Sequence, residues 1–577
     1  MCGILGGINT DFDDRHLARL HHRGPDQSAM LRQNLADLGV LALGQTRLNI
    51  VERDDIHLPV TVGDAQIVFN GEIYNFPELR RELSNLGWTF HTRTDIEVAL
   101  IAYLQWGVDC LSRFNGMFAF AVWDGNRFFC ARDRLGKKPL FYRTRGRSFE
   151  FASEIKAFSN LRFVSHDVFD LFEFCFNGMT LYDGIHALSP AHYLLYDRRS
   201  GTCETRAYWD VGHYVDHRIA DENAAVERFI ELLEDAVSLR LRADVDVSLF
   251  LSGGIDSSLI ARLAMPDTAF TCQFDEFLPE IDEEQYAVDL ARRLGIELKV
   301  IRPTRDQFFR DLPSMAYHLE TPTGSFSVFP LYRLAKAACD AGYKVVLSGE
   351  GSDELFAGYV RNEWLLGEKG RADDESAAPY HAMFSRYQGS DLDRFCRMAS
   401  RSGLNGAAAM KMFLSEYWDE RKSMVENIGY LETRLFLQPL LQMNDRMTMA
   451  HGVEARCPFL DHRLVEFAFS LDDRLKFRDG TGKWIVHQAA RRLLPRGSLV
   501  LERKIKHGLP TPVNLWLQGR HGFDRRHWNT LLTAECMKAL LDGHGCVMRE
   551  MSAERTARVL SQSPTTDRNA PLTNAAL

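Results

Sequence analysis

Short apolar runs, broken by Gly, Asn and Asp, fill most of the first two hundred residues. Such runs predict β-strands, of which the clearest are 41–45, 66–70, 117–123, 127–131 and 148–152. Apolar residues three and four positions apart predict helices over 76–86 and 96–105. Strands and helices mixed in this way favour α+β layers. The irregular segment 198–214 predicts a linker.

A different pattern begins near residue 221, where short β-branched runs alternate with helical stretches. The predicted strands and helices are, in chain order, 223–241, 245–251, a helix from Ser257, 269–274, 283–294, 297–301, 329–341 and 344–347. This alternation is typical of a parallel, doubly wound sheet with helices on both faces. Beyond about residue 360 the pattern is mainly helical, and the polar stretch from about 561 is expected to fray.

The composition limits the class of protein. A chain of 577 residues exceeds the roughly 100–200 residues of one domain, and its 45% hydrophobic and 25% charged residues exclude collagen-like and disordered chains. With 69 basic and 78 acidic residues the net charge is −9, so nucleic acid is not an expected partner. No long apolar window predicts a membrane span, and eleven cysteines without a CxxC pair predict neither disulfides nor zinc. We therefore expect a cytoplasmic multidomain enzyme.

Cys2 follows the initiator methionine directly. Removal of that methionine places a thiol and a free α-amine on one residue. Because the α-amine has a reference pKa of about 7.7–8.0, it can take the proton of the thiol near neutrality. On its own, Met-Cys-Gly is better explained as an accidental start, with Cys2 as a small buried hydrophobe.

Four further motifs follow Cys2 in order. They are His-Arg-Gly-Pro-Asp at 22–26, Arg-Leu-Asn-Ile-Val at 47–51, Asn-Gly-Glu-Ile-Tyr-Asn at 70–75 and Thr-Asp-Ile-Glu at 94–97. With Cys2, this order resembles the class II glutamine amidotransferases, whose glutaminase domain is an N-terminal-nucleophile hydrolase. The match departs from the family at Ala29 and at 57–60, positions that carry none of the chemical groups considered below.

The resemblance implies a role for each of these residues. Cys2 is the nucleophile, and Asn70 with the backbone N–H of Gly71 forms the oxyanion hole that a tetrahedral intermediate needs. Holding the zwitterionic end of glutamine requires one cation and one anion. The residues that match the glutamine ligands of the family are Arg47, Ile50, Asn70, Gly71, Glu72 and Asp95. Taken singly, Asn-Gly is also a good hairpin turn, and Arg47 an ordinary ion-pair partner.

A Ser-Gly-Gly turn at 252–254 joins the apolar strand to the next predicted helix. Such a turn presents backbone N–H groups and the positive end of the helix dipole, which suits phosphate. It is neither a P-loop nor a G-x-G-x-x-G fingerprint, and a tight connection is the simpler interpretation of two glycines. The string S-G-G-x-D-S-S matches the pyrophosphate loop of ATP pyrophosphatases. The matching ATP ligands are Leu251, Ser252, Gly253, Gly254, Asp256, Ser257, Ser258, Cys272, Ser348 and Gly349.

A second loop, Ser-Gly-Glu-Gly-Ser-Asp at 348–353, follows another predicted strand. Ligands of doubly wound sheets bind beyond the carboxyl ends of strands, so both loops are expected to border one site. Asp256 and Asp353 are then expected to share Mg²⁺, and Glu350 is placed to be a general base. By the same match, Lys483 is the lysine that neutralises the α-phosphate and the leaving pyrophosphate.

The resemblance extends over residues 1–520 to the glutamine-hydrolysing asparagine synthetases, and the stretches 450–461, 482–484, 503–504 and 506–509 continue it. It implies an α+β N-terminal-nucleophile hydrolase sandwich over 1–210 and an α/β ATP pyrophosphatase domain over 215–520. A helical C-terminal extension with a disordered end is expected over 521–577.

The same resemblance implies a reaction in two parts. Cys2 releases ammonia from glutamine through a thioester, and MgATP adenylates a carboxylate, aspartate by default, whose AMP the ammonia displaces. An enclosed channel is expected to connect the two sites. The expected partners are glutamine, ATP and this carboxylate, with a homodimer as one option for the assembly.

Three alternatives stay open. One is an amidotransferase for another carboxylate, such as a sugar acid or a natural-product intermediate, because the segment 320–327 near the expected acceptor pocket is unusual. Another is a cyclase of the β-lactam synthetase type, disfavoured because the glutaminase residues are present. The third is a glutaminase with a regulatory nucleotide module, disfavoured because Asp256, Glu350, Asp353 and Lys483 are intact.

Overall fold

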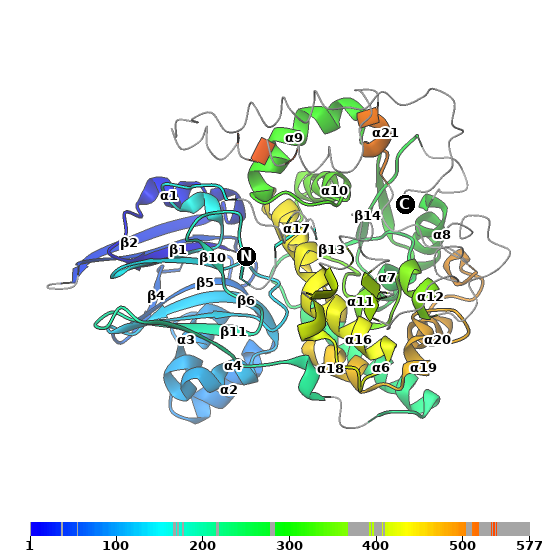
Figure 1. Cartoon of the computed structure of the whole chain (residues 1–577), viewed down its shortest axis with the longest axis horizontal. Helices are drawn as coiled ribbons and strands as arrows, with labels where there is room; N and C mark the ends of the chain where they lie inside the picture. The colour runs from blue at the N-terminus through cyan, green and yellow to red at the C-terminus, as the bar shows by residue number, and fades with distance from the viewer. Residues whose placement is uncertain are drawn as a thin grey trace.

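The computed structural model of the chain describes residues 2–35, 39–54, 56–164, 178–214, 218–276, 283–366, 414–502 and 511–518, with isolated residues in 169–175, 392–412 and 532–538. The stretches 503–504 and 506–509, and nearly all of the predicted extension 521–577, lie outside the described residues. Two structural units result, an amino-terminal unit up to residue 214 and a carboxyl-terminal unit from residue 218, which face each other across a long interface (Figure 1).

The amino-terminal unit holds two six-stranded antiparallel sheets. In spatial order, the first consists of β10 (His186–Ala187), β8 (Phe141–Arg145), β9 (Ser148–Ala152), β1 (Cys2–Ile8), β3 (Gly39–Arg47) and β2 (Gln27–Leu35). The second consists of β12 (Cys203–Ala207), β11 (His192–Asp197), β7 (Arg127–Arg132), β6 (Gly116–Trp123), β5 (Ala65–Ile73) and β4 (Val60–Val62).

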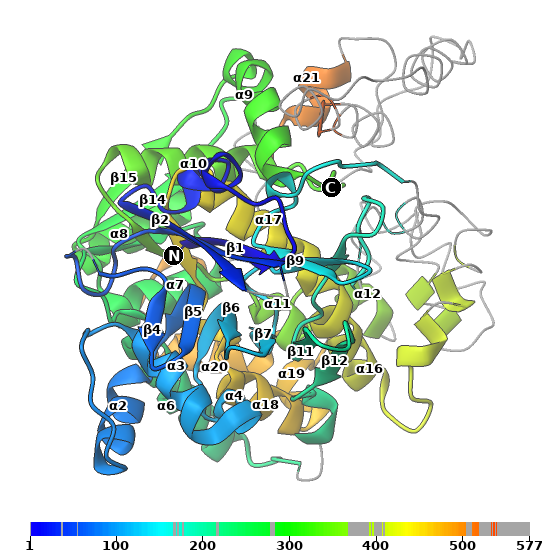
Figure 2. The same ribbon diagram turned by 90° about the vertical axis from the view of Figure 1, so that its left-hand side faces the viewer.

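Successive side chains along each strand pack on opposite faces of the sheet, and this alternation produces the layers of the unit. On β5, Val68 packs with Ile4 and Leu43 of the other sheet. Its neighbours Ile67 and Phe69 instead join the cluster formed with α2 (Phe76–Asn85) and α3 (Asp95–Trp106). Because successive side chains of a strand point to opposite faces, the sequence pattern produces a sandwich with helices outside it, as predicted (Figure 2).

The predicted linker 198–214 is wrong for its first half. Strands β11 and β12 form a hairpin there, so the segment extends the second sheet. Asp197 accepts hydrogen bonds from Arg199 N and Ser200 N, and Gly201 has a φ of +72°. The Arg-Arg-Ser-Gly-Thr string therefore forms a turn. Asp197 precedes it and accepts hydrogen bonds from its backbone, and Gly201 occupies the position with a positive φ.

The carboxyl-terminal unit is built on a five-stranded parallel sheet, which confirms the predicted α/β architecture. Its order is β15 (Glu297–Ile301), β14 (Thr268–Cys272), β13 (Val247–Phe250), β16 (Val345–Leu347) and β17 (Glu454–Arg456). Strand β17 is absent from the sequence-based elements because its three residues lie inside a stretch with a mainly helical pattern.

Helices cover both faces of this sheet. Leu249 of β13 packs into a cluster with α6 (Glu222–Arg240), α7 (Ile255–Ala264), α8 (Glu284–Leu294), α18 (His462–Ser470) and α20 (Trp484–Leu493). Phe250 packs on the other face with α9 (Arg305–Leu319), α10 (Val328–Asp340), α17 (Leu437–Met449) and α21 (Val513–Gln518). Shorter helices are α1 (Asp14–Ala18), α4 (Cys110–Arg113), α11 (Ser352–Leu355), α12 (Val360–Leu366), α16 (Met424–Leu431), a π-helix (Glu432–Phe436) and α19 (Asp473–Lys476).

Fully buried charges join the two units. Arg23 of the amino-terminal unit contacts Glu154 at 2.7 Å and Asp445 of α17 at 2.9 Å. Arg446, the next residue of α17, contacts the same Glu154 at 2.6 Å and Glu320 at 2.7 Å. Each of these side chains has an exposed fraction of 4% or less. Helix α17 thus supplies both a cation and an anion to the interface, where it runs between the sheets and β13 (Figure 1).

Glu320 belongs to this interface. It ends α9 with a φ of +60°, and its carboxylate accepts hydrogen bonds from Ile155 N at 2.9 Å and Lys156 N at 2.6 Å. The Lys156 ammonium lies 3.3 Å from it. The first residue of the unusual segment 320–327 therefore holds the two units together, and it does not line an acceptor pocket.

We predict that Glu320→Gln lowers the stability of the protein by about 3 kcal/mol, because Arg446 and Lys156 keep their buried charges and lose a counter-charge. The measurement is the urea midpoint of unfolding. Glu204→Gln is the matched control: Glu204 forms an exposed pair with Arg206 at 2.8 Å, for which we expect a loss below about 0.5 kcal/mol. Equal midpoints for the two variants would contradict the structural role of Glu320.

Candidate active sites

Cys2 is the first residue of β1 and is 4% exposed. Its backbone nitrogen donates a hydrogen bond to Asn70 Oδ1 over 3.2 Å, and its Sγ accepts one from Gln45 Nε2 over 3.4 Å. Burial raises the pKa of the Cys2 thiol, while the positive charges of the amino terminus and Arg47 oppose that shift. The thiol therefore needs a base before it can attack.

Asn70 and Gly71 lie in β5 beside Cys2. Asn70 is fully buried, and its Nδ2 has no hydrogen-bond partner among the described residues, although its Oδ1 is engaged by Cys2. Gly71 has a φ of +149°, and a Cβ at this position would lie 2.1 Å from Met117 O. Only glycine fits there, and the amide of Asn70 keeps a donor for an incoming group.

Arg47 anchors the loop that follows β3. Its guanidinium donates to the carbonyl oxygens of Val51 at 2.9 Å, Glu52 at 2.6 Å and Asp54 at 2.9 Å. These bonds use three of the five donors of the side chain. Arg47 pairs with Cys2 in the β1–β3 ladder, so the cation is fixed beside the strand that begins with Cys2.

Ile50 lies in the interface between the units. Its side chain is in the apolar cluster that also holds Val345 and Met449, and its carbonyl accepts a hydrogen bond from Asp244 N at 2.8 Å. Ile50 thus packs against the carboxyl-terminal unit as well as near Leu48 and Val51 of its own loop.

Asp95 and Glu72 are buried acids near the end of β5. Asp95 accepts a hydrogen bond from Ile73 N at 2.9 Å, and burial raises its pKa to about 6. Glu72 Oε1 lies 3.5 Å from Arg456 Nη2 of the other unit. Burial, with repulsion from Asp95 and Glu454, raises the pKa of Glu72 well above its usual range. Glu72 therefore belongs to an acidic cluster that spans both units.

The loop 252–254 turns from β13 into α7 with the help of its own serines. Ser257 Oγ accepts a hydrogen bond from Ser252 N at 3.2 Å and donates one to Gly254 O at 3.1 Å. Gly253 has a φ of +70°, and a Cβ there would lie 2.7 Å from Glu283 O. The loop is thus fixed at the amino end of α7, where backbone N–H groups favour an anion.

The two predicted loops meet at one edge of the parallel sheet. A Cβ on Gly349 would lie 3.1 Å from Ser257 N and 3.2 Å from the Cβ of Asp256, so the loops touch. Ser348 N donates to Arg456 O at 2.9 Å, which ties the second loop to β17. Strands β13 and β16 are neighbours in the sheet. From β13 the following strands β14 and β15 are added on one side, and from β16 the strand β17 is added on the other side. Ligands of such sheets bind at the point where this strand order reverses.

The remaining predicted nucleotide ligands border the same edge. Leu251 N donates to Phe270 O at 2.8 Å, and Ser258 Oγ donates to Gly254 O at 2.8 Å. Cys272 is the last residue of β14, and burial raises the pKa of its thiol.

Lys483 lies between the two predicted metal ligands. Its Nζ is 2.7 Å from Asp256 Oδ2 and 2.6 Å from Asp353 Oδ1. Lys483 has a φ of +56° before α20, and a Cβ on Gly358 would lie 2.0 Å from the lysine Cε. The backbone and this glycine therefore fix the ammonium between the carboxylates.

The two aspartates fit a magnesium site in which phosphate oxygens of a bound nucleotide supply further ligands. Among the described residues no group of three or more His, Cys, Asp and Glu side chains is arranged to hold a metal ion. Two carboxylates meet across one ammonium here, and Mg²⁺ is commonly held by one or two carboxylates together with phosphate oxygens.

Glu350 lies in the loop 348–351, next to Gly349. Burial, with repulsion from Glu354, raises the pKa of Glu350 to about 7, although a hydrogen bond from the side chain of Asn444 in α17 opposes this rise. A carboxyl group with this pKa is half ionised at neutral pH, which suits proton transfer in either direction.

Three further residues contact these sites without having been predicted from the sequence. Gln45 donates to the Cys2 thiol, and its position two residues before Arg47 on one strand was the available signal. Arg23 lies in a recognised motif, yet its Nε donates to Cys2 O at 3.1 Å, a role that the motif alone did not indicate. Asn444 faces Glu350 from a helix far along the chain, which no local pattern reveals.

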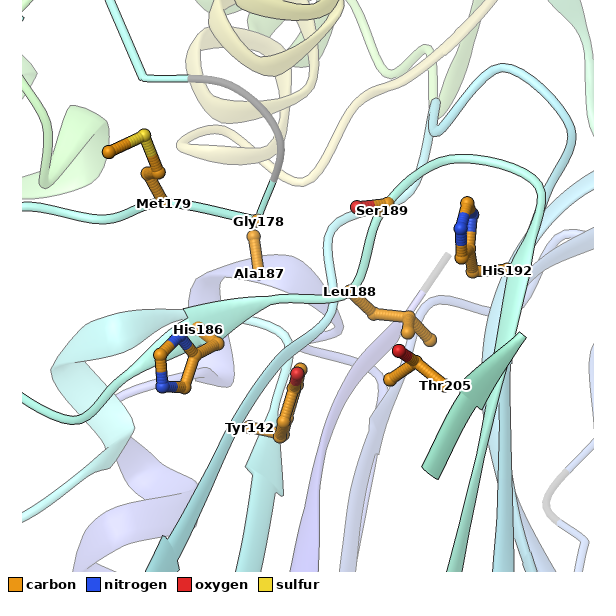
Figure 3. Close-up of a pocket in the computed structure, with 9 residues that line it drawn as sticks. All are labelled: Tyr142, Gly178, Met179, His186, Ala187, Leu188, Ser189, His192 and Thr205. Atoms are coloured by element: carbon orange, nitrogen blue, oxygen red, sulfur yellow. The ribbon is translucent and has the colours of Figure 1, made fainter. Parts of the chain in front are cut away.

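A separate cavity of about 220 Å³ lies in the amino-terminal unit (Figure 3). Tyr142, His186, His192 and Thr205 are among the residues that line it, from strands β8, β10, β11 and β12. None of the predicted site residues lines this cavity, so it is distinct from both candidate active sites.

A cysteine at the start of a two-sheet sandwich, joined to a nucleotide-type loop on a parallel sheet, agrees with the class that the family models and relatives show: a glutamine-hydrolysing amidotransferase of the ligase type. The family model for the glutamine amidotransferase domain matches residues 1–209, and the model for asparagine synthase matches residues 228–554. The chain belongs to the asparagine synthase family, which uses ATP as a substrate.

Curated relatives match most of the chain. Asparagine synthetase [glutamine-hydrolyzing] 1 of Bacillus subtilis is 30% identical over 90% of this chain and 88% of its own length. A putative asparagine synthetase of Mycobacterium tuberculosis is 31% identical over 87% and 84%. Amidase chyE of Penicillium rubens is 28% identical over 81% and 79%.

Within the described part of the chain, no helix is long and apolar enough to span a membrane.

We predict that Gly71→Ala reduces the kcat of glutamine hydrolysis by at least about 100-fold, because the added Cβ displaces the backbone that follows Asn70. Gly63→Ala is the matched control, since Gly63 also has a positive φ but no atom within 4 Å of a Cβ. Glutamate release by both purified variants is the measurement. Wild-type hydrolysis by Gly71→Ala would show that this backbone position does not shape the site.

Proposed function

We propose that this enzyme hydrolyses glutamine at Cys2 and uses the ammonia to convert aspartate to asparagine, with ATP cleaved to AMP and pyrophosphate. One observation carries the proposal: Asn70 Oδ1 holds the nitrogen of Cys2, so the buried Nδ2 of the same amide has a donor left for an oxyanion. We further propose that the functional division is 1–210, 215–520 and 521–577. Aspartate is the acceptor suggested by the names of the relatives.

In the glutaminase step, removal of Met1 turns the Cys2 nitrogen into an α-amine of pKa about 7.7–8.0 that takes the proton of the thiol. The thiolate attacks the side-chain amide carbon of glutamine, and Asn70 Nδ2 and Gly71 N donate to the resulting oxyanion. Ammonia leaves, and water then hydrolyses the thioester. Arg47 binds the α-carboxylate of glutamine, and Asp95, assisted by Glu72, binds its α-ammonium. Ile50 completes the glutamine site from the loop after Arg47, which packs against the carboxyl-terminal unit.

In the synthetase step, the loop 252–258 holds the phosphates of ATP, and the adenosine lies against Leu251, Cys272, Ser348 and Gly349. Asp256 and Asp353 would hold Mg²⁺, which when bound neutralises phosphate charge. A carboxylate oxygen of aspartate attacks the α-phosphorus, and Lys483 accompanies the leaving pyrophosphate. Glu350 takes the proton of the ammonia that displaces AMP, a role suited to its pKa of about 7.

A different carboxylate acceptor is the alternative that has weak support from the relatives. This support comes from the relatives named amidase, 28% identical, whereas Glu320, the first residue of 320–327, holds the interface. A panel of carboxylic acids, scored for glutamine-dependent pyrophosphate release, tests the choice of aspartate directly.

We predict that Cys2→Ala abolishes glutamine-dependent synthesis and leaves synthesis from added ammonia within about twofold of wild type, because the second site does not use the thiol. Cys339→Ala, a change at an exposed cysteine, is expected to preserve both activities. Intact mass spectrometry of the wild-type enzyme checks that Met1 is absent. Loss of both activities in folded Cys2→Ala would refute the division into two sites.

Asp256→Asn is expected to reduce pyrophosphate release by at least about 100-fold, because it removes the negative charge beside Lys483 in the proposed ATP site. Glutamine hydrolysis should continue, because the site at Cys2 is unchanged. Asp267→Asn serves as the control. Asp267 is an exposed residue just before β14, at the end of the strand away from Cys272. Pyrophosphate and glutamate are measured in the same reaction. Undiminished pyrophosphate release would remove Asp256 from the proposed metal site.

A further inference from the structure

Gln45 places a fully buried amide in a layer that is otherwise apolar. Alternate residues of β3 point to the same face of the sheet, so Gln45 follows Leu43, which packs with Val68 of β5 in the space between the two sheets. A polar group in such a layer is costly unless its hydrogen bonds are made. The partners of the Gln45 side chain therefore deserve an explanation, and one of them is the sulfur of Cys2.

The Gln45 carboxamide is held in a single orientation. Its Oε1 accepts a hydrogen bond from Phe69 N over 3.0 Å, which is possible because β4 pairs with residues 65–67 of β5 and ends before Phe69. A backbone N–H can only donate, so the amide oxygen must face Phe69 and the amide nitrogen must face the other way. There Nε2 donates to Cys2 Sγ over 3.4 Å.

Two adjacent residues of β5 thereby hold both reactive atoms of Cys2. Asn70 Oδ1 accepts directly from the Cys2 nitrogen over 3.2 Å, and Phe69 holds the sulfur through Gln45. Sulfur and nitrogen are thus fixed relative to the strand that carries the donors of the proposed oxyanion hole. Rotation of the Cys2 side chain away from this strand would break its bond to Gln45.

We propose that Gln45 is a catalytic residue of glutamine hydrolysis: its Nε2 donates to the Cys2 sulfur and stabilises the thiolate in the attacking position. This role rests on the proposed function, in which Cys2 is the nucleophile. A hydrogen bond to a charged atom is roughly twice as strong as one to a neutral atom, so the donor favours the thiolate over the thiol. Because the Cys2 side chain is buried, little water is available to do the same.

Charged groups from five elements surround Cys2. They are Arg47 of β3, Arg23 of the 3-10 turn His21–Arg23, Glu72 of β5, Asp95 of α3 and Glu454 of β17. The positive amino terminus and Arg47 lower the pKa of the Cys2 thiol against the effect of burial, and the Gln45 hydrogen bond acts in the same direction. Gln45 is uncharged, so it adds this stabilisation without needing a buried counter-ion.

The chemical step balances with this donor in place. The S–H bond of Cys2 breaks, its proton moves to the α-amine, and the electron pair stays on the sulfur, to which Gln45 Nε2 donates. The sulfur then bonds to the amide carbon of glutamine, and the electrons of the C=O bond move to its oxygen. The C–N bond breaks, and the nitrogen leaves as ammonia with the proton of the α-ammonium.

The test is the full-length enzyme with Gln45→Glu, in which an oxygen can still accept from Phe69 N but the donor to sulfur is lost. At pH 7 we expect kcat for glutamine hydrolysis to fall about 10- to 100-fold, as for the loss of a hydrogen bond to a charged atom. The KM for glutamine should stay within about threefold, because Arg47 and Asp95 are unchanged. Gln33→Glu, which adds the same charge at an exposed position of β2, is the control and should match wild type.

Alkylation of Cys2 by iodoacetamide, followed over pH by peptide mass spectrometry, measures the thiolate directly. In Gln45→Glu its rate at pH 7 should fall about 10- to 100-fold, and its pH midpoint should rise by about one to two pH units. The loss should shrink at higher pH, where the thiolate forms without the donor. Synthesis from added ammonia should stay within about twofold of wild type, since the second site does not use the thiol.

Two results would overturn the assignment. One is an alkylation rate and a hydrolysis rate that Gln45→Glu leaves unchanged. The other is a loss of equal size at every pH, which would mean that Gln45 only supports the shape of the site. If Gln45→Glu does not fold, the uncharged Gln45→Met should show the same pH-dependent loss at smaller size, and a loss independent of pH in that variant would overturn the assignment as well.

Failure of the proposed function gives a different result. Cys2→Ala would then continue to hydrolyse glutamine, whatever the behaviour of the Gln45 variants. If Cys2→Ala is inactive with glutamine and Gln45→Glu resembles wild type, Cys2 keeps its proposed role and only the role of Gln45 is refuted.

Discussion

The two halves of this enzyme are held in register by charges that water does not reach. Arg23, Glu154 and Lys156 from one unit, with Glu320 and Arg446 from the other, alternate in sign through a fully buried interface. Each charge is tolerable there only because its neighbours carry the opposite sign, so the relative position of the units is specified sharply. Every geometric relation between the two candidate sites depends on that arrangement.

Helix α17 carries residues of this buried interface together with a residue that contacts Glu350. Its apolar side packs under the parallel sheet through Met443 and Met447, while Asp445 and Arg446 enter the interface. Asn444, on the same turn, faces Glu350. A shift of either unit would therefore move the contacts of the Cys2 carbonyl and of the Glu350 carboxyl group together.

The sequence was sufficient for the local parts of this design. Strand and helix periodicity located most elements, and the motifs with Cys2, Asn70 and Ser252 specified loops whose backbone requirements are local. It was insufficient where distant segments meet. The three residues of β17 form a strand only because β16 lies beside them, Glu320 acquires its role from Lys156, and Gln45 from Cys2. Such contacts are set by tertiary packing, which no window along the chain reports.

The order of these segments along the chain has a consequence for biosynthesis. The sandwich is complete by Ala207, whereas Asp445, Arg446 and β17 leave the ribosome more than two hundred residues later. Until then Arg23 and Glu154 lack their partners from α17, and the strand beside β16 is missing. Because amino-terminal domains fold first during translation, the nascent glutaminase half waits in an unfinished state. The buried interface can therefore be completed only after the last third of the polypeptide has been made.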